Sequence, residues 1–302
     1  MTNPFIQDIK NQYKNGSALI KLLFINGGVF VALHVFSLIL WAFNISNGTA
    51  VLLHWMALPA DFSQLVVKPW TLISYMFLHE GIWHLAMNMV ILYFGSQIFL
   101  QYLSEKKLVT LYVLGGLAGG FLYVLAFNLL PVFEPILPVS IALGASASVI
   151  AILVAAATYV PNFVVRLMFI GNVKLKYVAM GYIVWDVISI QGNNSGGHIA
   201  HLGGALFGFI FIQQIKKGND FTLGFSRFLA YLKAVLTSMF KPKSKLKVVY
   251  KKQGKSKTNK AYNAQKVNNQ KKIDQILDKI SKSGYDSLTA EEKAILFDAS
   301  KK

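Results

Sequence analysis

Long apolar stretches alternate with short polar breaks from the start of the chain to about residue 215. A helix needs about 20 mostly apolar residues to cross a bilayer. The first stretch is longer than the roughly 7–15 apolar residues of a signal peptide, so we interpret it as a retained span. We therefore expect an all-α membrane protein with a bundle of six transmembrane helices. The predicted spans are residues 22–45, 79–102, 108–130, 139–160, 176–191 and 198–215.

Lysine and arginine lie almost entirely at one end of these predicted spans. They precede the first span, join the second to the third and the fourth to the fifth, and follow the sixth. Loops rich in these residues face the cytoplasm. The sequence predicts a multi-pass integral protein of a bacterial-type inner (plasma) membrane, with both termini cytoplasmic. The loops at 46–78, 131–138 and 192–197 would then face outward.

Most of the positive charge follows the last predicted span. The formal net charge is +17, and 12 lysines lie in residues 241–272. Because so polar a segment cannot bury a core, we expect a disordered linker, attracted to anionic lipid rather than to nucleic acid. Residues 216–240 are apolar but contain Arg227 and Lys233, which favours an interfacial helix over a seventh span. Residues 1–21 form an N-terminal cytoplasmic segment.

The end of the chain returns to a helical pattern. Apolar residues recur at helical spacing over 273–280, and Gly284 is a plausible stop. Thr289 and Glu292 have the spacing of a capping box, which opens a second helix. We expect residues 273–302 to form a small helical hairpin, a cytoplasmic appendix that docks to a partner or to the membrane domain.

Polar side chains inside the apolar stretches are expected at one depth. The second, fourth and sixth spans run in the same direction, and Ser146 lies about seven residues, roughly 10 Å, past Val139. His84 and Asn88 are four residues apart on one helical face, and His201 lies near the start of the sixth span. Ionisable groups inside a membrane are costly and mark functional sites. The sequence thus predicts one polar layer near the outer face.

Small residues flank this polar layer. Ala147 begins an alanine stripe at four-residue spacing, and Gly204 and Gly208 form a G-x-x-x-G pattern. Such patterns allow helices to approach closely, although they also occur in ordinary packing of a membrane bundle. Beside a serine and a histidine at matching depth, we interpret them as the means of bringing Ser146 to His201.

The combination of these residues resembles the rhomboid family of intramembrane serine proteases. The resemblance covers about residues 60–215 and implies a six-span protease domain over residues 22–215. It implies that Ser146 is the nucleophile and that His201 is its base, without a third acidic partner. The matching residues are Trp70, Phe77-Leu78-His79, His84 and Asn88 in an H-x4-H-x3-N pattern, Gly144-Ala145-Ser146, and Ala200-His201-Leu202-Gly203-Gly204 followed by Gly208.

The resemblance also implies that His84 and Asn88 form part of the oxyanion site. A serine hydroxyl needs an adjacent base at neutral pH, which an imidazole supplies. The oxyanion needs fixed donors, which His84, the Asn88 amide and the Ser146 backbone N–H can provide. No metal or other cofactor is required. Four residues are expected to be structural near the site: His79, Gly144, Gly204 and Gly208.

The substrate class follows from the same resemblance. It implies hydrolysis of a peptide bond in or near the transmembrane helix of a membrane-anchored protein, beside a small residue. That helix must unwind near its outer end, because helical hydrogen bonding hides the scissile carbonyl. The partners would be transmembrane protein substrates and the lipid bilayer, and the site would open toward the outer face, where water is available.

Three positions depart from the usual pattern of the family. Ala147 replaces the final glycine of G-x-S-G, and Thr71 follows Trp70 where arginine is common. Ile150 replaces an aromatic residue that often stacks on the histidine. Alanine is small enough to be tolerated, whereas Ile150 is expected to hold His201 less firmly.

Other interpretations of these residues stay open. His198 lies three residues before His201 on a similar face and competes with it as the base. Asp186 is an acid in the fifth span, which we expect to be solvated at the membrane interface or to act near substrate entry. The chain is alternatively a catalytically silent rhomboid-like protein that binds transmembrane helices, or a six-span transporter. A transporter is less favoured because its site would lie near the midplane, between pseudo-symmetric halves.

Overall fold

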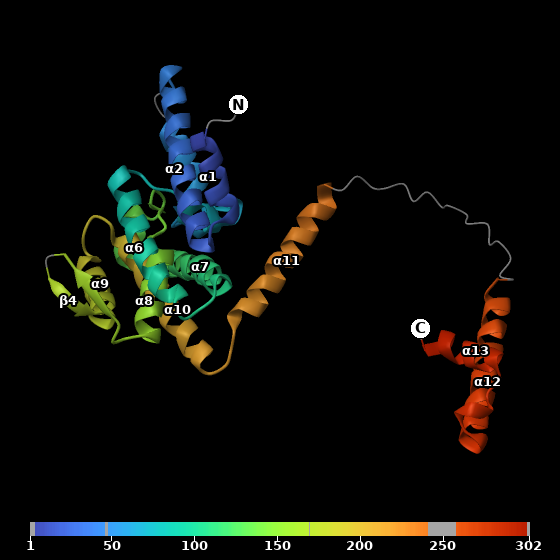
Figure 1. Ribbon diagram of the computed structural model, residues 1–302. Coiled ribbons are helices and arrows are strands. Elements are labelled where there is room, and N and C mark those ends of the chain that lie inside the picture. The colour runs from blue at the N-terminus through green and yellow to red at the C-terminus, as the bar shows by residue number, and fades with distance from the viewer. Residues whose placement is uncertain (1–3, 46–47, 169, 241–257, 301–302) are drawn as a thin grey trace. The chain divides into compact units, whose positions relative to one another are not determined.

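The computed structural model describes residues 4–45, 48–168, 170–240 and 258–300. They are mostly helical and divide into two compact units, Met1–Met239 and Phe240–Lys302 (Figure 1). The helices up to the boundary between the units are α1 (Pro4–Asn15), α2 (Ala18–Ala42), α3 (Gly48–Met56), α4 (Phe62–Val67), α5 (Thr71–Ser74), α6 (Ile82–Leu100), α7 (Glu105–Leu129), α8 (Ser146–Tyr159), α9 (Leu175–Ser189), α10 (Ser195–Lys216) and α11 (Phe221–Phe240).

Short segments join these helices. Two of them are 3₁₀ turns, Tyr75–Phe77 and Pro131–Ile136. The strand β1 (Leu58–Pro59) pairs antiparallel with β2 (Ile141–Ala142), and β3 (Val164–Leu167) pairs with β4 (Gly171–Lys174). The first of these pairs ties the loop between α3 and α4 to the residues that lead into α8.

Four of the described helices are long and apolar enough to cross a membrane: α2, α6, α7 and α10. The helix α8 is apolar but has only 14 residues, and α9 has 15. At 1.5 Å per residue these two span about 21–23 Å, less than the roughly 30 Å of the hydrocarbon core. Each of the six predicted spans contains a helix, but the number of helices that cross the membrane stays a prediction.

The fourth predicted span begins later than the sequence indicated. Residues 139–145 are not helical, and α8 starts at Ser146. Gly144 has a φ of +126°, which lies outside the helical region, and Ile141–Ala142 is a strand. The prediction that Ser146 lies about seven residues inside a helix is therefore wrong, because Ser146 is the first helical residue.

The helix α8 lies among the other helices of the bundle. It packs against α6, α7, α9 and α10, and its residues from Ala147 to Ala157 are all buried. Glycines let α10 approach its backbone. A Cβ added at Gly204 would overlap the carbonyl oxygen of Ala147, and one added at Gly208 would overlap that of Ala151. The G-x-x-x-G pattern thus brings the two backbones together, as in other membrane helix pairs.

This contact also sets the level of two predicted site residues. Gly204 lies three residues after His201 on α10, and Ala147 lies one residue after Ser146 on α8. Because Gly204 packs against Ala147, the side chains of Ser146 and His201 emerge from the two helices at the same level.

The variant Gly208→Ala is expected to lower the thermal unfolding temperature, because the added methyl group overpacks the contact with Ala151 at a cost of about 1–3 kcal/mol. The measurement is Tm of the purified protein in detergent. Gly181→Ala in α9 is the matched control, because nothing lies within 4 Å of a Cβ added there. Alanine favours a helix by about 1 kcal/mol over glycine, so this variant is expected to keep or raise Tm. Equal Tm values for both variants would contradict the close contact of α8 with α10.

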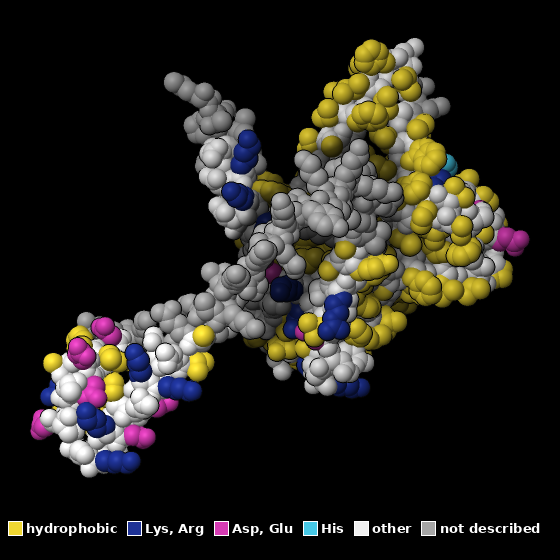
Figure 2. Space-filling view, turned by 90° about the vertical axis from the view of Figure 1, so that its right-hand side faces the viewer, with side chains coloured by type: hydrophobic (Ala, Val, Ile, Leu, Met, Phe, Trp, Pro, Cys, Tyr) yellow, Lys and Arg dark blue, Asp and Glu magenta, His cyan; other side chains and the backbone are white. Residues whose placement is uncertain are grey.

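Apolar side chains also cover the outside of the first unit. Figure 2 shows hydrophobic side chains spread over its visible surface. The exposed apolar residues of α2 include Val31, Val35, Leu38 and Trp41. Soluble monomeric proteins rarely expose so large an apolar area. This surface is suited to contact with lipid chains.

The helix α11 follows α10 after a turn. Gly218 has a φ of +85° and ends α10. Asp220 in the same turn forms an ion pair of 2.9 Å with Lys107 at the start of α7. The helix covers most of residues 216–240, for which the sequence predicts an interfacial helix, and its position relative to a membrane stays a prediction.

The second unit is a pair of helices, α12 (Thr258–Ser283) and α13 (Ala290–Ser300), joined by a 3₁₀ turn. Gly284, with a φ of +77°, follows α12. The Thr289 N–H donates to the Glu292 carboxylate at 2.8 Å, and the Glu292 N–H donates to the Thr289 hydroxyl at 3.3 Å. Lys279 and Thr289 hold the pKa of Glu292 below its usual value by hydrogen bonding to its carboxylate. The predicted capping box is therefore present.

The predicted disordered linker at 241–272 is wrong in its second part. Residues 258–272 belong to α12. Lysine, glutamine and alanine are good helix formers, so a polar composition alone does not exclude a helix that packs on a neighbour. Residues 241–257 lie outside the described part of the chain.

Candidate active site

Four predicted site residues line one cavity of about 660 Å³: Ser146 from α8, His201 from α10, and His84 and Asn88 from α6. They lie far apart in the sequence and meet because α8 packs against both α6 and α10. The wall of the cavity also includes Ile150 and polar side chains such as Asn194. The structure thus brings together all the residues to which the sequence assigns a chemical role.

Ser146 occupies the N-terminus of α8. The first backbone N–H groups of a helix have no partner within the helix, and the positive end of the helix dipole lies there. The Gly144 N–H donates to the Tyr75 carbonyl at 2.9 Å, which fixes the turn before the serine. A serine in a helix interior can bond the backbone of the preceding turn, but at the first position no helical turn precedes it. The Ser146 hydroxyl makes no hydrogen bond to any described residue.

His84 and Asn88 lie one turn apart on α6. The Asn88 side-chain amide donates to the His84 carbonyl at 2.9 Å, so its second amide proton is free of that bond. His84 approaches the turn before Ser146 closely, since a Cβ added at Gly144 would lie 2.9 Å from its Nε2. Gly144 therefore leaves the space that His84 occupies.

His79 lies in the segment before α6 and packs edge-on against His84, with 5.0 Å between ring centroids. It is buried, and neither ring nitrogen has a hydrogen-bond partner among the described residues. It lies beside His84 and outside the cavity lining, and its structural role near the site stays a prediction.

His201 is held by a residue whose environment the sequence did not predict. Its Nδ1 lies 2.9 Å from Oδ1 of Asp186 on α9, and Nδ1 of His198 lies 2.8 Å from the same oxygen. The Asp186 side chain is only 3% exposed. The expectation that Asp186 is solvated at the interface is therefore wrong. The sequence signal was an acid within an apolar span, near the end of α9 that leads to the first turns of α10, where both histidines lie.

Among the described residues, no hydrogen bond joins the Ser146 hydroxyl to the His201 ring. Catalytic hydrogen bonds are often longer in the free enzyme and tighten when substrate binds. The two groups line the same cavity, and the Nδ1 contact with Asp186 leaves Nε2 of His201 as the nitrogen available to the serine.

Comparison with known proteins identifies the family of this fold. The model of the rhomboid domain matches residues 67–218, half of the chain. The chain belongs to the rhomboid family. A second model, described as a family of unknown function (DUF6576), matches residues 257–302.

Several curated proteins resemble this rhomboid. The presenilin-associated rhomboid-like protein, mitochondrial, of Mus musculus is 28% identical over 143 residues, which cover 45% of this chain and 35% of that protein. The Bos taurus protein of the same name is 26% identical over 189 residues, or 60% and 46% of the two chains. RHOMBOID-like protein 12, mitochondrial, of Arabidopsis thaliana is 29% identical over 158 residues, or 49% and 47%. This rhomboid thus spans about a third to a half of the length of these relatives.

The comparison corrects the predicted location. The names of these relatives place them in mitochondria, so the expectation of a bacterial-type inner membrane with cytoplasmic termini is wrong. The distribution of lysine and arginine predicts which loops share a side of the membrane. It carries no information about which membrane that is.

Two of the departures from the family pattern have a structural explanation in this rhomboid. A Cβ added at Gly119 of α7 would crowd the Ala147 methyl group, so the alanine fills the space against α7 that a glycine would leave open. The Thr71 hydroxyl donates to the Lys68 carbonyl at 2.6 Å, and the Trp70 indole donates to the Trp55 carbonyl at 2.8 Å. Both side chains thereby fix the backbone between α3 and α5 by hydrogen bonds.

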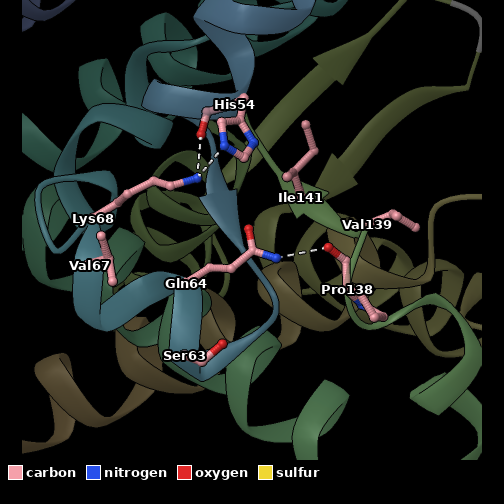
Figure 3. A pocket seen from close by; sticks show the side chains of 8 residues that line it. All are labelled: His54, Ser63, Gln64, Val67, Lys68, Pro138, Val139 and Ile141. Carbon is pink, nitrogen blue, oxygen red and sulfur yellow. Dashed lines mark hydrogen bonds between the residues drawn. The ribbon is translucent and has the colours of Figure 1, made fainter.

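Lys68 supplies a cation in this loop. Its Nζ lies 2.9 Å from Nε2 of His54 and donates to the His54 carbonyl at 3.1 Å, beside a cleft of about 610 Å³ (Figure 3). Gln64 on the same side donates to the Pro138 carbonyl at 2.9 Å. The Lys68 bonds tie the loop to α3, and the Gln64 bond connects it to the segment that leads toward Ser146. The third departure, Ile150, is buried and lines the same cavity as Ser146 and His201.

Proposed function

We propose that this rhomboid is an intramembrane serine endopeptidase that hydrolyses a peptide bond in or near the transmembrane helix of membrane-anchored proteins. The observation that carries the proposal is the shared cavity, in which Ser146, His201, His84 and Asn88 meet. A serine at a helix N-terminus next to an imidazole and two further donors is the set of groups that acyl transfer requires.

His201 acts as the base. Its Nε2 accepts the proton of the Ser146 hydroxyl as the oxygen attacks the scissile carbonyl, and it returns that proton to the leaving amine. A water molecule then attacks the acyl-enzyme, with His201 again taking and returning the proton. No metal or other cofactor takes part in these steps.

The oxyanion is stabilised by donors that are in place before the reaction. The free amide proton of Asn88, the His84 ring and the backbone N–H of Ser146 border the place where this charge develops. The positive end of the α8 dipole adds to their effect. Loss of one such donor typically costs about 10²–10³-fold in rate.

The membrane domain binds its substrate from the bilayer. We propose that α2, α6, α7, α8, α9 and α10 form a six-helix bundle over residues 22–215, with α11 at the interface and the C-terminal helix pair as an appendix. The substrate helix unwinds at the cavity to expose its scissile carbonyl, and a small residue at the cleavage site fits beside the glycine and alanine residues there. The lysine-rich residues after α11 attract anionic lipid.

A second candidate is a catalytically silent rhomboid-like protein that binds transmembrane helices. The absence of a Ser146 to His201 hydrogen bond among the described residues favours it. Such a protein would bind a transmembrane helix at the same cavity and would not hydrolyse it.

Cleavage of a reconstituted substrate separates the two candidates. The purified protein is placed in lipid vesicles with a panel of single-span proteins that carry small residues near either end of the span, and the products are identified by mass spectrometry. We expect a cut near one end of the span, beside a small residue. Binding of the panel without any cut, by a protein that is shown to be folded, would support the silent protein.

A further inference from the structure

Asp186 accepts hydrogen bonds from two histidines through a single oxygen. The Nδ1 atoms of His198 and His201 lie 2.8 and 2.9 Å from its Oδ1. An ionised carboxylate only accepts hydrogen bonds, so each imidazole donates its Nδ1–H to it. In a neutral ring this leaves the other nitrogen, Nε2, unprotonated.

The burial of Asp186 is costly for the fold. The residue is 2% exposed, and its second oxygen, Oδ2, has no partner among the described residues. Burying a carboxylate that is incompletely paired destabilises a protein, and acids inside membrane spans generally serve a function. The position of Asp186 thus points to a role in the site.

We propose that Asp186 is a positioning residue that holds the His201 ring with its Nδ1–H toward α9 and its Nε2 toward Ser146. The proposal rests on the serine protease function proposed above and extends its serine–histidine pair to a serine–histidine–aspartate arrangement. Asp186 is outside the cavity lining, so its effect passes through the orientation and protonation of His201.

The proton stays on the histidine throughout. When His201 takes the Ser146 proton on Nε2, the ring becomes an imidazolium whose Nδ1–H still points at the Asp186 carboxylate. The negative charge stabilises that cation, and Asp186 itself does not take up the proton. The same carboxylate prevents the ring from turning its protonated nitrogen toward the serine, where it could not act as a base.

His198 is the second histidine that hydrogen-bonds Asp186. It lies one turn before His201 on α10, and its ring is edge-on to that of His201, with 5.9 Å between centroids. His201 lines the cavity, whereas His198 is outside the lining. His198 therefore helps to satisfy the buried carboxylate, while His201 carries the proton. This distinction separates two histidines that the sequence leaves in competition.

A metal ion is the competing use of the same three side chains. Their ligand atoms lie within 4.8 Å of one another, and histidine with aspartate is a common ligand set for zinc. A metal bound there would occupy Nδ1 of both rings. Treatment with a chelator therefore belongs to the test.

The first readout is the rate of labelling by a fluorophosphonate probe, which needs no identified substrate. Asp186→Ala is expected to lower the labelling rate constant by about 10²-fold or more, within the roughly 10⁴-fold that triad aspartates can contribute. Asp186→Glu is expected to recover at least about 10-fold of the loss, since it restores the carboxylate. His198→Phe is expected to stay within about threefold of wild type. Chelation with EDTA is expected to leave wild-type labelling unchanged.

The second readout is the tautomer of His201, from ¹⁵N chemical shifts of histidine-labelled protein in nanodiscs. The wild-type neutral ring is expected to carry its proton on Nδ1, and Asp186→Ala is expected to move it to Nε2. If Asp186 only supported the fold, a variant that keeps the wild-type Tm would also keep the wild-type tautomer of His201. If Asp186→Ala does not fold, Asp186→Asn keeps the shape and removes the charge, and it is expected to lower labelling at least about 10-fold.

The outcomes distinguish this proposal from the one on which it rests. If wild type labels, and Asp186→Ala labels at the same rate with the same His201 tautomer, the role of Asp186 is overturned. The proposed protease function would then still stand. An equal loss in His198→Phe, or labelling that EDTA abolishes and zinc restores, would overturn the role of Asp186 as well. Wild-type protein that does not label would overturn the proposed protease function, and the tautomer would still decide whether Asp186 orients His201.

Discussion

Replacement of Ser146 by alanine is expected to reduce cleavage of a reconstituted single-span substrate by about 10⁶-fold, to the background level. The hydroxyl oxygen is the only heavy atom lost, and in the proposed reaction it forms the bond to the substrate carbonyl carbon. His201→Ala is expected to have an effect of similar size, because nucleophile and base act as a unit and their losses do not add. The measurement is the amount of product as a function of time in vesicles.

Ser148→Ala is the matched control for this prediction. Ser148 lies on the same helix, two residues after Ser146, but it is fully buried and outside the cavity lining. The same substitution there is expected to leave cleavage within about threefold of wild type. Cleavage by Ser146→Ala at more than a few per cent of the wild-type rate would exclude this serine as the nucleophile.

Gly144→Ala is expected to reduce cleavage by about 10³-fold while the protein stays folded. Its φ of +126° strains any side chain, and a Cβ would lie 2.9 Å from Nε2 of His84. The turn before Ser146 and the His84 ring must both move. A misplacement of 1 Å costs about 10²-fold, and loss of one oxyanion donor costs about 10²–10³-fold. Initial rates of cleavage and Tm are measured on the same preparation.

Gly171→Ala separates backbone strain from the clash with His84. Gly171, the first residue of β4, also has a positive φ, +85°, but nothing lies within 4 Å of a Cβ added there. This variant is expected to lose some stability and to keep its activity. If both variants reduced cleavage equally at matched Tm, contact of Gly144 with His84 would not be the cause.

The gathering of Ser146, His201, His84 and Asn88 could be predicted from the sequence. A spacing of four places two residues on one helical face, and spans that run in the same direction place their starts on the same side of the membrane. Small residues at four-residue spacing predict which helix faces meet. These local rules predict that the four residues meet, but not where α8 begins or what holds His201.

The start of α8 could not be predicted in the same way. Residues 139–145 are as apolar as a helix in a membrane, so hydropathy does not distinguish the strand pair and the turn at Gly144 from a helix. The strand β2 exists because β1, about 80 residues earlier, pairs with it. Such a long-range partner does not appear in a local pattern.

The environment of Asp186 also depended on tertiary structure. An apolar helix in a bilayer shows no polar face that fixes its rotation, so the sequence does not tell whether an acid on α9 faces lipid, water or α10. Only the packed structure shows that its Oδ1 meets both histidines.

Labelling with a fluorophosphonate probe tests the central claim most directly, since it detects an activated serine without a known substrate. The detergent-solubilised wild type is compared with Ser146→Ala, His201→Ala and Ser148→Ala, and the modified peptide is identified by mass spectrometry. We expect one adduct, on Ser146, in wild type and Ser148→Ala and none in the other two variants. A folded wild type that reacts with neither this probe nor a second serine-directed probe, or an adduct that persists in His201→Ala, would contradict the claim.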